Sequence, residues 1–206
     1  MFSIINRIKI KFGPKRWEII QYVIDKFSFT SYLEIGVSNR ECFDLIKCKE
    51  KTGVDPSPKS KVIEMTSDDF FLQNTKKFDV IFIDGLHHSI QVKKDIENSL
   101  KILNDGGYIF IHDCNPFNEK MQLVPRESVI WSGDVWKAWM HFRGIENLIM
   151  YVIDADYGMG VIWKGFQERI YVSNPQYKDL IRNRKRWLNI RSFKKFKNIL
   201  NHQLRK

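Results

Sequence analysis

The sequence predicts an α/β fold, in which a Rossmann-like, mostly parallel sheet of seven strands has helices on both faces and an antiparallel hairpin at its C-terminal end. Residues 80–83 and 108–111 are continuous apolar runs, which are typical of strands buried on both faces. A stretch with helical spacing separates them, so we expect parallel neighbouring strands. The 206 residues suffice for one such core and are too few for two ordinary domains.

The elements before these two runs follow from apolar spacing and from turn residues. Apolar residues at the spacing of a helix place the first helix, and Pro56 ends the second strand, because proline cannot continue a central ladder. The expected elements are, in order, a helix at 16–27, a strand at 32–36, a helix at 42–46, strands at 52–55 and 61–65, and a short helix at 68–73.

The second half of the chain continues the alternation. A strand at 78–84 leads to a helix at 89–103 with Ile90 and Ile96 on its apolar face, and Gly106 and Gly107 are expected to end that helix in a left-handed conformation. After the strand that follows, a helix is expected at 133–142. Strands at 147–152 and 158–164 are separated by a short acidic turn, which is typical of a hairpin at a sheet edge.

Ionisable side chains follow the two buried strands at the point where each strand ends. Asp84 and His87 come after the first, and His112 and Asp113 come after the second. Ligands of open α/β sheets bind outside the carboxyl ends of the strands. We therefore expect these four side chains to meet in one functional site.

Charge divides the chain into three parts, which we expect to be a basic amphipathic segment at 1–16, a domain at 17–165 and a second basic amphipathic segment at 166–206. Residues 1–16 carry five bases and no acid, and residues 178–206 carry eleven bases and one acid. Since the whole chain has a net charge of +10, residues 17–177 are acidic, at about −5. A body that coats nucleic acid is therefore disfavoured.

Three unpaired cysteines, the lack of an apolar stretch of membrane-spanning length and a poor signal-peptide pattern favour a cytoplasmic location.

Four segments together resemble the class I S-adenosylmethionine (SAM)-dependent methyltransferases, over roughly residues 17–164. They are the sequences LEIGV at 33–37, GVDP at 53–56, the strand at 78–84 and GGYIFIHD at 106–113. Within that class the chain looks most like small O-methyltransferases that act on sugars and other secondary-metabolite or cell-surface hydroxyls. A Rossmann dehydrogenase is the rival interpretation, but of its G-x-G-x-x-G motif only Gly36 is present.

The resemblance implies a set of SAM-binding residues. Gly36 lets the backbone approach the ligand closely, and Glu34 serves the aminoacyl end. Asp55 accepts the ribose hydroxyls, because an ionised carboxylate offers only acceptors. Asp68 is a candidate for the adenine amine, and Asp84 lies beside the methyl donor. Arg40 stands where the family usually has a further glycine.

The resemblance also implies how the methyl group is accepted. His87 is placed as the general base that removes the proton of the acceptor hydroxyl, with Asp84 beside it. A divalent ion such as Mg²⁺ would match Asp84, His112 and Asp113, although a histidine suits softer metals better. The alternative is that His112 and Asp113 have only a structural role, in which they form a hydrogen bond with each other. A cluster of Trp131, Trp136 and Trp139 is more often part of a core, but it is also a candidate wall for a carbohydrate substrate.

The expected acceptor is a sugar hydroxyl on a polysaccharide, a glycolipid or a nucleotide-linked precursor. The apolar and basic residues after 178 fit either the surface of an anionic membrane or docking on the domain, and these two alternatives stay open here. Nucleic acid is an unlikely partner. The alternative function is a non-catalytic adaptor with a methyltransferase fold that binds a membrane or RNA through its basic ends.

Overall fold

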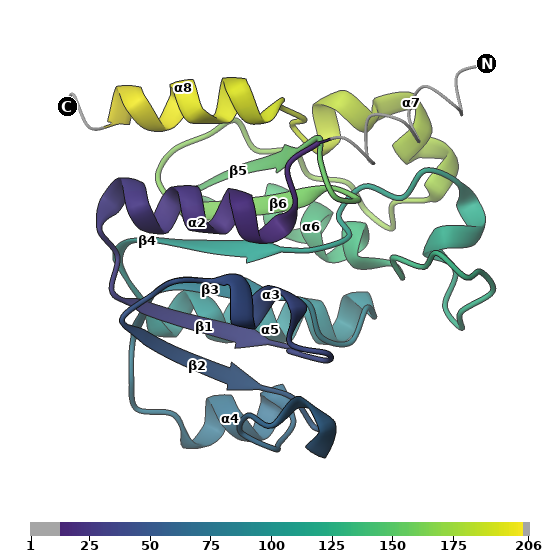
Figure 1. The fold of residues 1–206 in the computed structure, drawn as a ribbon. Helices are drawn as coiled ribbons and strands as arrows, with labels where there is room; N and C mark the ends of the chain where they lie inside the picture. Colours follow the sequence, from purple (N-terminus) through teal and green to yellow (C-terminus); the bar gives the residue numbers. More distant parts are fainter. Residues whose placement is uncertain (1–12, 204–206) are drawn as a thin grey trace.

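In the described part of the chain, six strands form one mixed sheet with helices on both faces (Figure 1). The computed structural model describes residues 13–203. The strands lie in the order β2-β1-β3-β4-β6-β5, with β1 to β4 parallel and β6 antiparallel to both of its neighbours. Their bounds are β1 Ser31–Ile35, β2 Glu50–Val54, β3 Phe78–Ile83, β4 Leu103–Ile111, β5 Leu148–Ile153 and β6 Met159–Lys164.

The helices pack apolar residues into the two cores on either side of the sheet. Their bounds are α2 Arg16–Phe27, α3 Glu41–Leu45, α4 Ser67–Gln73, α5 Ser89–Ile102, α6 Val135–Arg143, α7 Tyr177–Trp187 and α8 Phe193–Gln203. Residues from α2, α3 and α8 share one core with Tyr32, Phe82 and Phe110 of the sheet. Residues from α4, α5, α6 and α7 share a second core with Leu33, Ile81 and other sheet residues, because successive residues of a strand point to opposite faces.

The expected strand at 61–65 is not formed, which leaves six strands instead of seven. A 3₁₀ turn at Pro58–Ser60 precedes it, and Lys61 has a left-handed backbone with φ of 52°. Only Ile63 then reaches the sheet, in a single parallel bridge to Val54. A left-handed residue at the start of the expected segment redirects the chain, so the ladder does not extend.

The two glycines after α5 were also misassigned. The helix ends at Ile102, and Gly106 and Gly107 lie inside β4 instead of capping the helix. A Cβ on Gly107 would lie 2.6 Å from the carbonyl oxygen of Asp79 on β3, and the pairing of β3 with β4 shifts register between Phe78 and Val80. Here glycine marks a bulge where two backbones approach closely.

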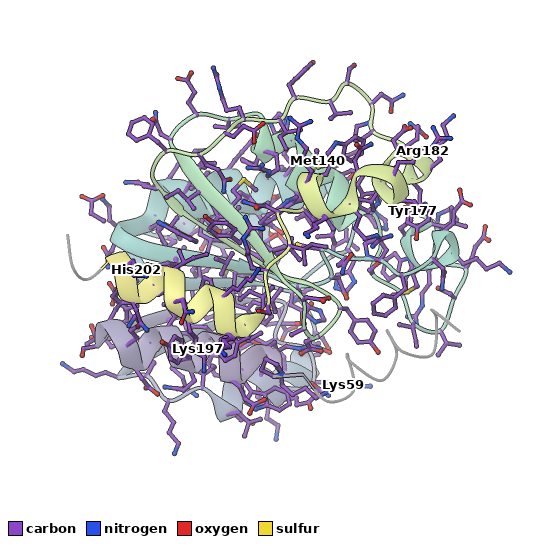
Figure 2. The ribbon with its side chains drawn as sticks, turned by 90° about the horizontal axis from the view of Figure 1, so that it is seen from above. Lys59, Met140, Tyr177, Arg182, Lys197 and His202 are labelled. Carbon is purple, nitrogen blue, oxygen red and sulfur yellow. The ribbon has the colours of Figure 1, made fainter. Side chains whose placement is uncertain are left out.

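The apolar residues of the C-terminal segment are packed against the domain. Leu180 of α7 and both Phe196 and Leu200 of α8 are fully buried, and the Phe196 ring lies 6.5 Å from that of Trp163 on β6. The outer face of α7 is basic and includes Arg182 (Figure 2). This arrangement favours docking over insertion of the apolar face into a membrane. Of the expected basic segment at 1–16, residues 1–12 lie outside the described residues.

Within residues 13–203, no helix combines the length and the hydrophobicity needed to cross a membrane.

Candidate active site

A cavity of about 960 Å³ lies at the carboxyl ends of the parallel strands. Every site residue expected from the sequence lines it, although the segments that carry them are far apart in the chain. These residues are Glu34, Gly36, Asp55, Asp68, Asp84, His87, His112 and Asp113. The expected convergence is therefore found, while the roles of the individual residues stay predictions.

The loop after β1 is shaped by close backbone packing. Gly36 has φ of 85°, and a Cβ there would lie 2.4 Å from the Asp84 carbonyl oxygen and from the Gly85 Cα. Glycine is thus required because the loops after β1 and β3 touch, which the sequence did not reveal. Arg40 has φ of 69°, so it adopts the left-handed conformation that a glycine would favour. Its guanidinium points away from the loop, to Asp44 at 2.7 Å and to the carbonyl oxygen of Ser60 at 2.8 Å.

Glu34 is a buried carboxyl at the floor of the cavity. Its side chain accepts a hydrogen bond from the Tyr32 hydroxyl. Burial raises the pKa of Glu34 to about 8, and the negative charge of Asp84 adds to that effect. At neutral pH this carboxyl is largely protonated in the ligand-free protein, and a cation placed beside it would favour its ionisation.

Asp55 and Asp68 both line the cavity. The two oxygens of Asp55 accept hydrogen bonds from the backbone N–H groups of Ser38 at 2.7 Å and Ser57 at 2.8 Å. These bonds fix the carboxylate and leave lone pairs for further donors. Asp68 is half-exposed and already pairs with Lys94 at 3.0 Å and Gln91 at 2.8 Å, which lowers its pKa.

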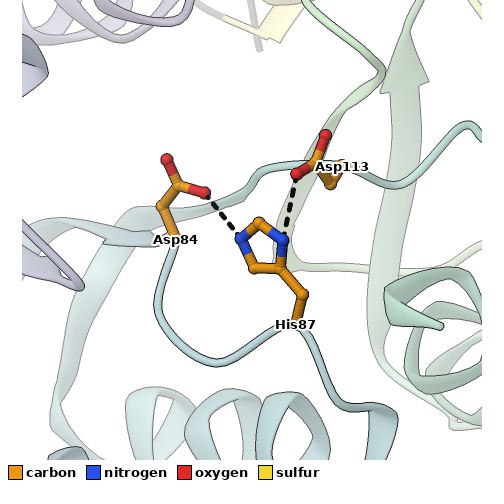
Figure 3. A group of neighbouring side chains, drawn as sticks. All are labelled: Asp84, His87 and Asp113. Carbon is orange, nitrogen blue, oxygen red and sulfur yellow. Dashed lines mark hydrogen bonds and ion pairs between the residues drawn. The ribbon is translucent and has the colours of Figure 1, made fainter. Parts of the chain in front are cut away.

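His87 lies between two carboxylates (Figure 3). Its Nε2 is 3.3 Å from Asp84 Oδ1, and its Nδ1 is 3.3 Å from Asp113 Oδ2. Burial alone would lower the pKa of His87, but the two carboxylates outweigh it and raise that pKa above its usual value. Of the two ring nitrogens, only Nε2 is in hydrogen-bonding geometry with a described carboxylate, and one-fifth of the side chain is exposed.

His112 faces the same carboxylates from the buried side. Its Nδ1 is 3.2 Å from Asp84 Oδ1 and 3.3 Å from Asp113 Oδ2. Although burial opposes a charge, these acids raise the pKa of His112 well above its usual value. In turn His112, His87 and the nearby Arg16 hold the pKa of Asp84 far below its normal range, against the effect of burial.

The side chains that could hold a metal ion are Asp84, His87 and Asp113, whose ligand atoms lie within 4.8 Å of one another. His87 thus takes the place that the sequence analysis gave to His112 in this set. Two carboxylates and an imidazole form a donor set that suits a divalent transition metal better than Mg²⁺, which prefers oxygen ligands.

Comparisons with known proteins agree with this arrangement. Residues 34–114 match the model of a methyltransferase domain family. A candidate caffeoyl-CoA O-methyltransferase from Staphylococcus aureus has a TM-score of 0.57 and 14% identity, with 79% of this chain and 91% of that chain covered. The protein has the class I methyltransferase fold.

Two further neighbours of the methyltransferase domain contain a bound product. SAH-bound PaMTH1 from Podospora anserina has a TM-score of 0.55 and 13% identity, covering 73% of this chain and 78% of that one. The O-methyltransferase from Bacillus cereus in complex with SAH has a TM-score of 0.50 and 12% identity, covering 78% and 86%. A comparison with curated proteins gave no match.

Residues 131–134, which the sequence analysis largely missed, form contacts on several sides of His87. The Trp131 ring stacks on the imidazole, with centroids 5.4 Å apart and planes 25° apart. Gly133 has φ of 57°, and a Cβ there would lie 1.8 Å from the His87 carbonyl oxygen. Asp134 donates its backbone N–H to that same oxygen and accepts hydrogen bonds from the N–H and hydroxyl of Ser89, where α5 begins.

The sequence analysis missed two more residues of the site, Arg16 and Asp156. Arg16 Nη1 is 2.6 Å from Asp84 Oδ2, and Arg16 Nε is 3.1 Å from Asp156 Oδ2. Spacing could not single out Arg16 from the other bases of the N-terminal segment. The acidic turn between β5 and β6 was visible in the sequence, but the sequence did not show that Asp156 would reach the site.

Proposed function

We propose that this protein is a SAM-dependent O-methyltransferase whose acceptor is a sugar hydroxyl on a polysaccharide, a glycolipid or a nucleotide-linked precursor. The observation that carries the proposal is the placement of His87 between Asp84 and Asp113, on the wall of the cavity that Asp55 and Gly36 also line. The match to a methyltransferase domain favours this enzymatic function over an adaptor that only binds a membrane or RNA.

The hydrogen-bonding groups and charges that line the cavity are complementary to those of SAM. Asp55 would accept the ribose hydroxyls, Asp68 would meet the adenine amine, and Glu34 would meet the ammonium of the aminoacyl end. Asp84 would lie near the sulfonium, which a carboxylate attracts. When bound, SAM supplies an electrophilic methyl group. The protein must then place an acceptor oxygen in line with that group and remove its proton.

His87 is the proposed base for the acceptor proton, and Asp84 is the catalytic residue that orients it. Asp84 orients the ring through Nε2, at 3.3 Å, whereas Nδ1 forms no hydrogen bond with the described residues and is the nitrogen that would accept the proton. Trp131 stacks on the imidazole and also lines the cavity. An aromatic surface beside the base suits the apolar face of a sugar ring, which supports the carbohydrate class of acceptor.

Calorimetry with SAM tests the cofactor part of this proposal. We expect Asp55→Ala to weaken SAM binding by about 10- to 100-fold, because a carboxylate that accepts two ribose hydroxyls contributes charge-assisted hydrogen bonds. Asp105→Ala is the matched control, since its side chain is 95% exposed at the start of β4, away from the cavity lining. Failure of the wild type to bind SAM at millimolar concentration would contradict the proposal.

Transfer from labelled SAM to fractionated cell-envelope glycans then identifies the acceptor. Label that is recovered in a glycan fraction supports a sugar hydroxyl as the acceptor, and label that is recovered only in material without glycan contradicts it.

A divalent cation is a second candidate element of the site, favoured by the group Asp84, His87 and Asp113. Such an ion would lower the pKa of the acceptor hydroxyl and orient it. The imidazole cannot bind the ion and act as the base through the same nitrogen. If the ion is required, we expect chelation to abolish methyl transfer, whereas unchanged transfer after chelation would show that the ion is not required. Activity of the EDTA-treated protein, with and without added Mn²⁺, measures this.

We also propose that the protein acts in the cytoplasm and meets an anionic membrane through exposed bases of α7 and α8. The exposed bases are Lys178, Arg182 and Lys185 of α7 and Lys194 and Lys195 of α8. They can contact anionic headgroups while the apolar residues of both helices stay packed against the domain. This contact would be electrostatic, so it would weaken as salt concentration rises.

A further inference from the structure

The charges that line the cavity are unevenly distributed. The carboxyl groups on its wall are Glu34, Glu41, Asp55, Asp68, Asp84 and Asp113. Among the described residues that line it, the side chain that is always positive is Arg16, since the remaining bases there are the imidazoles of His87 and His112. An acidic cavity of this kind attracts the sulfonium and the ammonium of SAM but repels its one anionic group, the α-carboxylate.

Arg16 is anchored by contacts that leave donors available. Its backbone N–H and its Nε both donate to Asp156 Oδ2, at 2.8 Å and 3.1 Å. Its Nη1 donates to Asp84 Oδ2 at 2.6 Å. A guanidinium has five N–H donors, of which these side-chain bonds use two. In the described part of the chain, nothing accepts a hydrogen bond from Nη2, and one quarter of the side chain is exposed.

The position of Arg16 agrees with the expected orientation of SAM. Arg16 contacts Asp84 after β3, and its charge also reaches Glu34 at the end of β1, where it opposes the raised pKa of that carboxyl. Glu34 is the residue proposed to serve the ammonium. The guanidinium therefore lines the same cavity as the group that would hold the other half of the same amino-acid moiety.

We propose that Arg16 binds the α-carboxylate of SAM. This assignment rests on the proposed function, because it presumes that SAM occupies the cavity. The fork of Nη1 and Nη2 matches the two oxygens of a carboxylate, and the bonds to Asp156 hold the fork in place before the ligand arrives. Arg16 also screens the incoming carboxylate from Asp84, so that the acidic wall does not exclude the one anionic part of the ligand.

Decarboxylated SAM tests this assignment, because it lacks only the carboxylate and keeps the adenosyl group, the sulfonium and the amine. Calorimetry should show that the wild type binds SAM about 10- to 100-fold more tightly than decarboxylated SAM, which is the range of a charge-assisted hydrogen bond. In Arg16→Gln that preference should vanish or reverse, since the carboxylate then meets only acids. Binding of 5′-methylthioadenosine, which lacks the whole amino-acid moiety, should be the same in both proteins.

Three outcomes separate the possible failures. Equal binding of SAM and decarboxylated SAM by the wild type overturns the role of Arg16 and leaves the proposed function standing. A preference for SAM that persists in Arg16→Gln overturns it as well. Failure of the wild type to bind any of the three ligands contradicts the proposed function itself.

Arg16→Gln also removes the partner of two buried carboxylates and could prevent folding, so the test includes a second variant. Arg16→Lys keeps the positive charge near Asp84 but loses the fork. We expect the preference of Arg16→Lys for SAM over decarboxylated SAM to fall several-fold below that of the wild type. An unchanged preference in that variant would contradict recognition by the fork.

Discussion

Replacing His87 with alanine is expected to lower the turnover of methyl transfer by about 100- to 10,000-fold, the usual contribution of a general base. The affinity for SAM should change much less, because His87 is proposed to contact the acceptor and not SAM. The measurement compares turnover in the presence of an identified acceptor with SAM binding by calorimetry. Unchanged turnover would remove His87 as the base.

The pH dependence of turnover in the wild type should also show that His87 acts as the base. Asp84 and Asp113 raise the pKa of His87 above its usual value, and a base acts only after losing its proton. Turnover should therefore increase as pH rises through a pKa above 6.5. In His87→Ala this rising limb should disappear. His88→Gln is the matched control, since none of the described carboxylates forms an ion pair with the neighbouring histidine, and it should keep the limb.

Replacing Gly36 with alanine should lower the free energy of unfolding by about 3 kcal/mol, which combines left-handed backbone strain with overlap in a packed interior. The added Cβ would lie 2.4 Å from backbone atoms of Asp84 and Gly85, so the loops after β1 and β3 would have to separate. We expect SAM binding to be lost as well, because that separation moves Asp84. Urea denaturation and calorimetry measure the two effects.

Gly106→Ala is a matched control for strain without overlap. Gly106 has φ of 79°, close to that of Gly36, but a Cβ there would meet nothing within 4 Å. Its substitution should lower the free energy of unfolding by about 1 kcal/mol, the cost of the left-handed conformation alone. Equal losses at the two positions would show that contact between the loops does not determine the requirement for Gly36.

The sequence predicted the parts of the fold that depend on local pattern. The helix expected at 16–27 is α2, and the apolar run at 80–83 lies in β3 beside its expected parallel neighbour β4. The sequence-based prediction was wrong where a contact with a distant part of the backbone determines the local structure. Gly107 faces the Asp79 carbonyl oxygen across the sheet, which no local pattern reveals. Ile90 was expected on the apolar face of its helix but is 77% exposed, because the buried face of α5 runs through Val92 and Ile96 instead.

The candidate site could be predicted to the same extent. Asp84, His87, His112 and Asp113 were found because strand ends in a parallel sheet converge, which is a property of the topology. Arg16, Asp156 and Trp131 were missed or undervalued, since each reaches the cavity from a helix start, a hairpin turn or a loop. The sequence contains no periodicity that relates such segments to the sheet edge.

The contacts of residues 131–134 with His87 have a consequence for how this enzyme can diversify. Trp131 both seats the imidazole and lines the space where an acceptor would enter, and Gly133 and Asp134 tie the same segment to the start of α5. A substitution in this segment that admits a new acceptor also moves the proposed base. Changes of acceptor preference and changes of reactivity are therefore coupled here, and evolution of a new specificity would need compensating changes in both.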